Sequence, residues 1–192
     1  RKRGSNMLSN ANEAATASPS LSKDARFKLG DGRKIPCVGF GTYQIQQEVC
    51  APIVSGALGL GYPHIDTAEI YGNEAACGEA LAASGIPREN VFLTTKLWPG
   101  WGSPDQSKNR ESTVASCRES LRKLGVEQVD LYLIHAPLGG GKEGRLAQYE
   151  GLVECQRLGL CASIGVSNFG IAHLTEIEDA GLPKPAANQL EL

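Results

Sequence analysis

The sequence predicts an α/β fold, a (β/α)8 barrel in which about six of the eight strands are present, preceded by a β-hairpin. From Phe27 onward, short β-branched runs alternate with longer helical patterns. This alternation is typical of a parallel sheet covered by helices, either doubly wound or closed into a barrel. One apolar run after another ends in a polar side chain that can do chemistry. Parallel strands bring their carboxyl ends to one face, as in the active site of a (β/α)8 barrel, so these ends favour the barrel.

A hairpin is expected first. Residues 27–40 read FKLGDGRKIPCVGF, in which Gly30, Asp31 and Gly32 supply the residues that tolerate a positive φ in a tight turn between two short strands. The core strands are then expected at 38–42, 64–66, 91–96, 129–135, 163–168 and 186–192.

Helices are expected between these strands. Four of them are followed by a glycine, which adopts the left-handed conformation beyond a helix end without Cβ strain. They span about 73–84, 107–124, 143–158 and 170–180, and the glycines are Gly85, Gly125, Gly159 and Gly181. The helix near 47–60 is expected to be short or kinked, because Pro52, Gly56 and Gly59 lie within it.

Two regions are predicted along the chain. Residues 1–24 are rich in Ser, Ala and Asn, so we expect a disordered arm; a remnant of an organelle transit peptide would have a similar composition. Residues 25–192 are expected to form the barrel domain. The chain begins with Arg1 and ends at Leu192 inside an apolar and polar alternation, so a fragment that is incomplete at its carboxyl end is expected.

The composition narrows the classes of function. With 41% hydrophobic and 21% charged residues, the chain suits a globular protein and neither a disordered nor a collagen-like one. Lys and Arg total 19 against 21 Asp and Glu, so there is no electrostatic reason to expect a nucleic-acid partner. Because no apolar run reaches about 18 residues, no integral membrane protein is expected. A small-molecule substrate is the better expectation.

The cysteines give no sign of a metal site. Neither a CxxC pair nor a zinc-like cluster with histidine occurs among Cys37, Cys50, Cys77, Cys117, Cys155 and Cys161. They are interpreted as free, mostly buried thiols of a reducing compartment, which predicts a cytoplasmic protein. A disulfide framework is the alternative.

Two glycine-rich stretches resemble nucleotide-binding motifs and fail on context. Gly39 and Gly41 follow a strand, but Gln44 stands where a dinucleotide fingerprint has its third glycine. Residues 139–142 read GGGK and are followed by Glu143 in place of the Ser or Thr that a phosphate-binding loop needs for magnesium. Neither stretch therefore predicts a Rossmann domain or a phosphate-binding loop, and residues 139–142 are interpreted as a flexible loop.

Five motifs carry a family resemblance. They are HIDTAEIYGNE (64–74), TTKLW (94–98), LIHAP (133–137), SIGVSNF (163–169) and NQLE (188–191), and their order and spacing resemble the aldo-keto reductase superfamily from about Phe27 to the last residue. The resemblance implies a TIM-type barrel closed at its base by the hairpin. It also implies that NADP(H) is bound without a Rossmann domain and that aldehydes or ketones are reduced. The seventh and eighth βα units, which in the family hold the adenosine 2′-phosphate, are not among the strands counted here.

The resemblance places the catalytic residues at Asp66, Tyr71, Lys96 and His135. Hydride delivery to a carbonyl carbon leaves an alkoxide that needs a proton donor, and Tyr71 is the expected donor. Lys96 is expected to lower the pKa of that phenol while paired with Asp66. His135, in its neutral form, is expected to orient the substrate oxygen.

The remaining site residues follow from the same motifs. Hydroxyl and carboxamide groups can complement a nicotinamide carboxamide in a buried site. The cofactor-binding set is Gly41, Thr42, Asp66, Ser167, Asn168 and Gln189, with Thr42 offering a hydroxyl. The substrate pocket is expected to be lined by Tyr43, Trp98 and His135, with Trp101 either part of this wall or packed on the scaffold. His64 is interpreted as a structural histidine, and His173 as a surface residue.

Two other functions stay open at this point. A non-catalytic barrel could bind the nicotinamide cofactor as a sensor or interaction subunit, and then the cofactor would bind without turnover. A truncated fragment would have no activity of its own.

Overall fold

The computed structural model describes residues 24–191. The strands are β1 (Arg26–Lys28), β2 (Lys34–Pro36), β3 (Phe40–Gly41), β4 (His64–Asp66), β5 (Phe92–Leu97), β6 (Val129–Ile134), β7 (Cys161–Ser167) and β8 (Asn188–Gln189). The helices are α1 (Gln47–Gly59), α2 (Glu74–Ala83), α3 (Arg110–Leu124), α4 (Gly141–Arg157) and α5 (Ile171–Asp179), with short 3₁₀ turns η1 (Glu69–Tyr71), η2 (Arg88–Asn90) and η3 (Pro104–Gln106). The expected disordered arm lies outside the described residues except for its last residue, Asp24.

Strands β3 to β8 form one parallel sheet in the order of the chain, β3-β4-β5-β6-β7-β8. The sheet is strongly curled. The evidence is a contact between β4 and β8, in which Gln189 Nε2 donates a hydrogen bond of 2.8 Å to Asp66 Oδ2. In a flat sheet these strands would lie about 19 Å apart, at about 4.8 Å per strand. A curled parallel sheet with sequential strands confirms the prediction of a partial (β/α)8 barrel.

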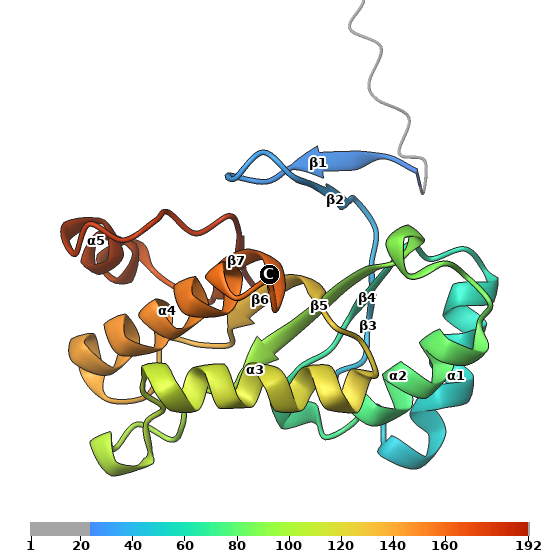
Figure 1. The fold of residues 1–192 in the computed structure, drawn as a ribbon, viewed down its shortest axis with the longest axis horizontal. Coiled ribbons are helices and arrows are strands. Elements are labelled where there is room, and N and C mark those ends of the chain that lie inside the picture. Colours follow the sequence, from blue (N-terminus) through green and yellow to red (C-terminus); the bar gives the residue numbers. More distant parts are fainter. Residues whose placement is uncertain (1–23, 192) are drawn as a thin grey trace, which may run out of the picture.

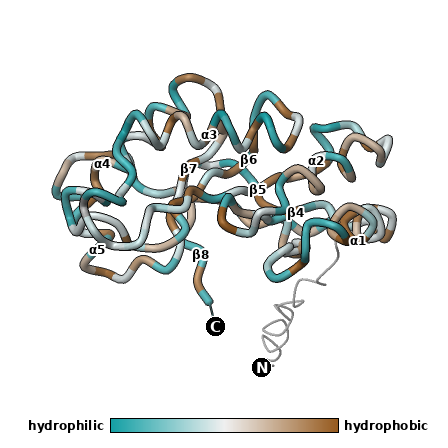
Figure 2. Tube along the Cα trace, turned by 90° about the horizontal axis from the view of Figure 1, so that it is seen from below, coloured by the Kyte–Doolittle hydropathy of each residue, from teal (hydrophilic) through white to brown (hydrophobic). Residues whose placement is uncertain are grey.

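Apolar layers lie on both faces of this sheet. Helices α1 to α5 form an arc around its outer face (Figures 1 and 2). Alternate side chains of β5 enter different layers, because Leu93 and Leu97 join the large cluster under the helices and Phe92 points to the inside of the curl. The inner cluster consists of Leu29, Phe92, Leu131, Leu133 and Ala186.

The predicted hairpin is present as the antiparallel pair β1 and β2. Of its two turn glycines, only Gly32 has a positive φ, of 92°. The turn is tied to the sheet by Ser163 Oγ, which donates to Asp31 Oδ2 at 2.6 Å, and by Gly30 N, which donates to the carbonyl of Ala186 at 2.9 Å. The hairpin therefore docks on β7 and on the segment that leads into β8.

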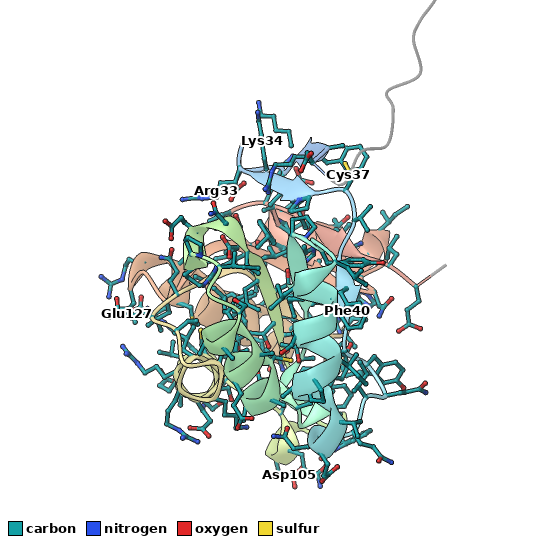
Figure 3. All side chains as sticks on the ribbon, turned by 90° about the vertical axis from the view of Figure 1, so that its right-hand side faces the viewer. Arg33, Lys34, Cys37, Phe40, Asp105 and Glu127 are labelled. Carbon is teal, nitrogen blue, oxygen red and sulfur yellow. The ribbon has the colours of Figure 1, made fainter. Side chains whose placement is uncertain are left out.

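The hairpin and the loop after β5 lie at opposite ends of the molecule. Figure 3 shows Arg33 and Lys34 of the hairpin region at one end and Asp105 of η3 at the other. The carboxyl ends of the strands are therefore free of the hairpin.

The elements differ from the sequence prediction at four places. Residues 139–142 are expected to form a flexible loop, but Gly141 and Lys142 are the first two residues of α4. The first helix, expected to be short or kinked, is not short, because α1 is one continuous helix of 13 residues that contains Pro52. Burial of Cys50, Val54 and Leu58 against the sheet outweighs the poor local propensity. The strands expected at 38–42 and 186–192 shrink to two residues each, since β3 and β8 each have one strand neighbour within the described part of the chain. The glycines after α2 to α5 have the predicted positive φ, from 65° to 74°.

The cysteines are free and mostly buried, as expected. All six are free thiols, and all of them except Cys37 are buried. Over residues 24–191, no helix combines the length and the apolar character that a membrane span requires.

The edges of the sheet predict self-association of the polypeptide 1–192 when it is made alone. Strands β3 and β8 leave backbone groups without a strand partner on their outer sides in residues 24–191. Large apolar side chains are also exposed in the helices that follow β3 and β7, namely Val49 and Ile53 on α1 and Ile171 on α5. Sedimentation velocity should show oligomers that grow with protein concentration. A fluorescence titration with NADPH should show little binding. A monomer with cooperative unfolding and micromolar affinity would contradict this expectation.

Candidate active site

Polar side chains gather at the carboxyl ends of the strands, as the sequence predicts. Asp66 is the last residue of β4, His135 follows β6, Ser167 ends β7 and Gln189 ends β8. Lys96 is the last but one residue of β5. Because the strands are parallel, all five residues lie at one end of the curled sheet.

Alternate side chains of β4 and β5 point to the inside of the curl, and these inward side chains contact each other in two pairs across the strands. His64 Nε2 lies 2.9 Å from Thr94 Oγ1, and Lys96 Nζ forms an ion pair with Asp66 Oδ1. Lys96 is 1% exposed, and its ammonium also donates to the carbonyl of Thr67 at 3.0 Å. Burial lowers the pKa of Lys96, and the charge of Asp66 partly compensates. A buried cation is thus held at a fixed place.

His64 has the structural role expected for it. Its buried ring packs edge-on against Phe92, and burial lowers its pKa. A Cβ atom on Gly39 would come within 2.5 Å of His64 Nδ1. The glycine that resembles a dinucleotide motif is therefore required by packing on this histidine.

Tyr71 brings a phenol to the buried cation. It ends the turn η1, and Gly72 with a φ of 71° lets the chain leave the turn. The Tyr71 hydroxyl lies 3.5 Å from Lys96 Nζ and 3.4 Å from His135 Nε2. The four residues expected to be catalytic therefore form one connected cluster.

The expected lowering of the Tyr71 pKa is wrong, because the net shift is upward. Burial, together with the negative charge of Asp66, raises the pKa of Tyr71 to about 12. Burial is the largest cause, and the pairing of Lys96 with Asp66 leaves the phenol facing a nearly neutral ion pair and not an isolated cation. The phenol therefore keeps its proton at neutral pH.

His135 is neutral, as expected. Burial and the charge of Lys96 lower its pKa to about 4. Its Nδ1 is buried and has no hydrogen-bond partner within residues 24–191, while Nε2 faces the phenol of Tyr71. The imidazole can therefore share a hydrogen bond with the phenol, or with an oxygen placed beside it, without adding charge.

Aromatic side chains surround this cluster. The ring of Tyr43 lies 5.1 Å from that of Tyr71, and the ring of Trp98 lies 5.7 Å from that of His135. Trp101 is 72% exposed and packs on Trp98 at 4.8 Å, so it extends this wall. A cavity of about 670 Å³ lies elsewhere, between α2 and the carboxyl end of α3.

Three of the residues expected to bind the cofactor lie at the carboxyl ends of β7 and β8, with Asn168 directly after β7. Ser167 is 3% exposed, Asn168 has a left-handed φ of 59°, and the Gln189 carboxamide is bonded to Asp66. A Cβ atom on Gly41 would meet nothing within 4 Å, so space is open beside β3. These groups fit the amide end of a nicotinamide.

Thr42 differs from its expected role. It is fully buried, and its hydroxyl lies 3.2 Å from Asn73 Oδ1 and 3.3 Å from the carbonyl of Asp66. The hydroxyl is directed into the scaffold and is not available to a cofactor.

The sequence analysis missed two side chains that organise the site. The carboxylate of Glu69 accepts a hydrogen bond of 2.9 Å from the backbone of Trp98 and pairs with Lys108 at 2.5 and 2.6 Å. Asn73 is fully buried and joins two loops. Its place directly before α2 is typical of a helix cap, but its side chain makes no capping bond. Only the fold reveals these partners, because they lie 28 to 39 residues away.

A model of the aldo/keto reductase family matches residues 37–192, which include the whole cluster. The chain belongs to this family. An aldo-keto reductase from Mycolicibacterium smegmatis is 44% identical over 164 residues, which are 85% of this chain and 56% of that protein. The methylglyoxal reductase DkgB of Salmonella typhimurium is 40% identical over 159 residues, covering 82% of this chain and 57% of that protein.

Solved aldo-keto reductases share the fold. The crystal structure of an aldo/keto reductase from Brucella melitensis matches with a TM-score of 0.78 and 43% identity, over 88% of this chain and 63% of that chain. The Bombyx mori aldo-keto reductase in complex with NADP matches with a TM-score of 0.78 and 34% identity, over 89% of this chain and 59% of that chain. This aldo/keto reductase chain therefore spans little more than half the length of the curated relatives named here.

Proposed function

We propose that this aldo/keto reductase reduces an aldehyde or ketone to an alcohol with hydride from NADPH, and that Tyr71 donates the proton. The observation that carries the proposal is the Tyr71 hydroxyl, which lies 3.5 Å from Lys96 Nζ and 3.4 Å from His135 Nε2. Burial and the charge of Asp66 raise the pKa of Tyr71 to about 12, so the hydroxyl is protonated at neutral pH. It can then act as a general acid.

Three residues of the cluster have separate tasks, and Asp66 holds Lys96 in an ion pair. When bound, NADPH supplies the hydride that adds to the carbonyl carbon. The carbonyl oxygen then takes the proton of the Tyr71 hydroxyl, and the resulting phenolate faces the ammonium of Lys96. His135 holds the same oxygen by a hydrogen bond while remaining neutral, because its pKa is lowered to about 4. In the overall reaction, the carbonyl compound, NADPH and one proton are converted to the alcohol and NADP⁺.

The residues present suit the nicotinamide end of the cofactor. The hydroxyl of Ser167 and the carboxamides of Asn168 and Gln189 can complement both the donors and the acceptor of the nicotinamide amide. The backbone at Gly41 leaves open space beside β3. The bound NADP of the Bombyx mori relative supports NADP(H) as the cofactor.

The test is NADPH oxidation by the purified full-length protein with a reactive carbonyl compound. Methylglyoxal is a suitable first substrate, because it gives the Salmonella relative its name. We expect loss of NADPH absorbance that depends on the aldehyde, with formation of the alcohol in equal amount. Cofactor binding without turnover over a panel of aldehydes and ketones would instead favour the sensor or interaction subunit.

A further inference from the structure

Asn73 has a fully satisfied side chain in the interior of the protein. It is 0% exposed, and its amide nitrogen donates two hydrogen bonds of 2.9 Å, to the carbonyls of Thr42 and Ile45. Its Oδ1 accepts a bond of 2.9 Å from the Thr67 hydroxyl and lies 3.2 Å from the Thr42 hydroxyl. A carboxamide offers two donor hydrogens and two acceptor lone pairs. Both hydrogens are used here, one lone pair accepts from Thr67, and the other shares the single hydroxyl hydrogen of Thr42 with the carbonyl of Asp66.

These bonds join two loops that carry different parts of the site. Thr42 and Ile45 belong to the loop after β3, which carries Tyr43 and includes Gln44 with a φ of 63°. A left-handed conformation is strained for a residue other than glycine, so the bonds on either side help to hold it. Thr67 belongs to the loop after β4, which carries Tyr71. The rings of Tyr43 and Tyr71 lie 5.1 Å apart across the junction.

The same bonds also reach the buried cation. The Thr67 hydroxyl bonds to Asn73, and the Thr67 carbonyl accepts from Lys96 Nζ at 3.0 Å. A shift of the Thr67 backbone would therefore move an acceptor of Lys96 and the loop of Tyr71 together. Asn73 itself touches none of the four proposed catalytic side chains through the hydrogen bonds of its carboxamide.

We infer that Asn73 is a positioning residue, whose carboxamide fixes the loop of Tyr43 to the loop of Tyr71 and so sets the place of the phenol. The inference rests on the proposed function of Tyr71. Asparagine is required because aspartate has no amide hydrogen for the carbonyls of Thr42 and Ile45, and its charge would face both of them in a buried site.

The test compares Asn73→Asp with Gln156→Glu in the full-length protein. Gln156 supplies a matched exchange of amide for carboxyl, because its Nε2 donates to the carbonyl of Ala162 at 2.9 Å, at the start of β7 and far from the site. We expect Asn73→Asp to lower kcat by roughly 10- to 100-fold, since a misplacement of about 1 Å can cost about 100-fold. Gln156→Glu should lower the Tm and leave kcat unchanged.

A double-mutant cycle separates positioning from a merely structural role. In the Tyr71→Phe background, Asn73→Asp should change kcat by less than about twofold, because the group that it positions is gone. An equal loss of kcat in both backgrounds, or an unchanged kcat with a lowered Tm, would overturn the inference. If Asn73→Asp does not fold, Thr67→Val is the second variant. It removes the hydroxyl that donates to Asn73 Oδ1 at nearly constant side-chain volume. The same double-mutant cycle with Thr67→Val then tests the inference.

Hydrogen exchange provides a readout that does not need turnover. Asn73→Asp should speed amide exchange in both loops, 42–46 and 67–72, whereas Gln156→Glu should leave them unchanged. If the wild-type protein shows no turnover, the proposed function fails on its own, and the exchange data still decide whether Asn73 joins the loops. Unchanged exchange in either loop would contradict the junction.

Discussion

Tyr71→Phe is expected to lower turnover by roughly 10²- to 10⁴-fold, the range typical of lost general acid catalysis. The substitution keeps the ring and its packing against Tyr43 at 5.1 Å, and it removes only the hydroxyl between Lys96 and His135. NADPH binding should therefore change little. Steady-state NADPH oxidation gives kcat, and quenching of protein fluorescence gives the dissociation constant of the cofactor.

Tyr132→Phe is the matched control for that experiment. Tyr132 is fully buried under the helices, and its hydroxyl has no hydrogen-bond partner among the described residues. Its removal should leave kcat unchanged. Near-normal turnover in Tyr71→Phe would refute the assignment of the proton donor.

Lys96→Met is expected to abolish most activity and to destabilise the protein. The ammonium that faces the Tyr71 hydroxyl is lost, and Asp66 keeps its charge with Gln189 as a remaining partner. Breaking a buried ion pair costs about 3 to 5 kcal/mol, and the 15% exposure of the Asp66 side chain favours the lower end. Chemical denaturation measures the loss of stability. Lys184→Met, which removes an ion pair with Glu178 whose lysine is 82% exposed, should cost less than about 1 kcal/mol.

Asp66→Asn should destabilise the protein less than Lys96→Met, and its effect should depend on pH. Burial already lowers the pKa of Lys96, and without Asp66 the pKa falls further, so the folded variant can hold a neutral amine. Between this lowered pKa and the ordinary value near 10.4, the unfolded chain binds more protons than the folded one, so stability rises with pH. Chemical denaturation should show that the deficit of Asp66→Asn relative to wild type, in free energy of unfolding, is smaller at pH 9 than at pH 7. A fully active Lys96→Met, or a deficit that grows with pH, would refute this coupling.

The sequence predicts the strand order and the place of the site because both follow from position along the chain. Asp66, Lys96 and His135 stand at the ends of apolar runs, and parallel strands bring such ends together whatever the details of packing. These parts of the prediction depend on pattern and topology alone.

The rest depends on contacts between residues far apart in sequence. The direction of the Tyr71 pKa shift is decided by how deeply the phenol is buried and, next, by the negative charge of Asp66. The hydroxyl of Thr42 is taken by Asn73, which lies 31 residues away. The length of α1 reflects packing that overrides the propensity of Pro52. No local pattern in the sequence marks any of these contacts.

The docking of the hairpin has a consequence for the order of folding. The turn at Asp31 is held by Ser163, which lies 132 residues further along the chain, and by the carbonyl of Ala186. At about 5 to 20 residues per second, synthesis separates the hairpin from these partners by roughly 7 to 30 s. A segment made early can thus be secured only after β7 has formed. The nascent chain must keep its first two strands unattached throughout that interval, when exposed strand edges are most open to wrong pairing.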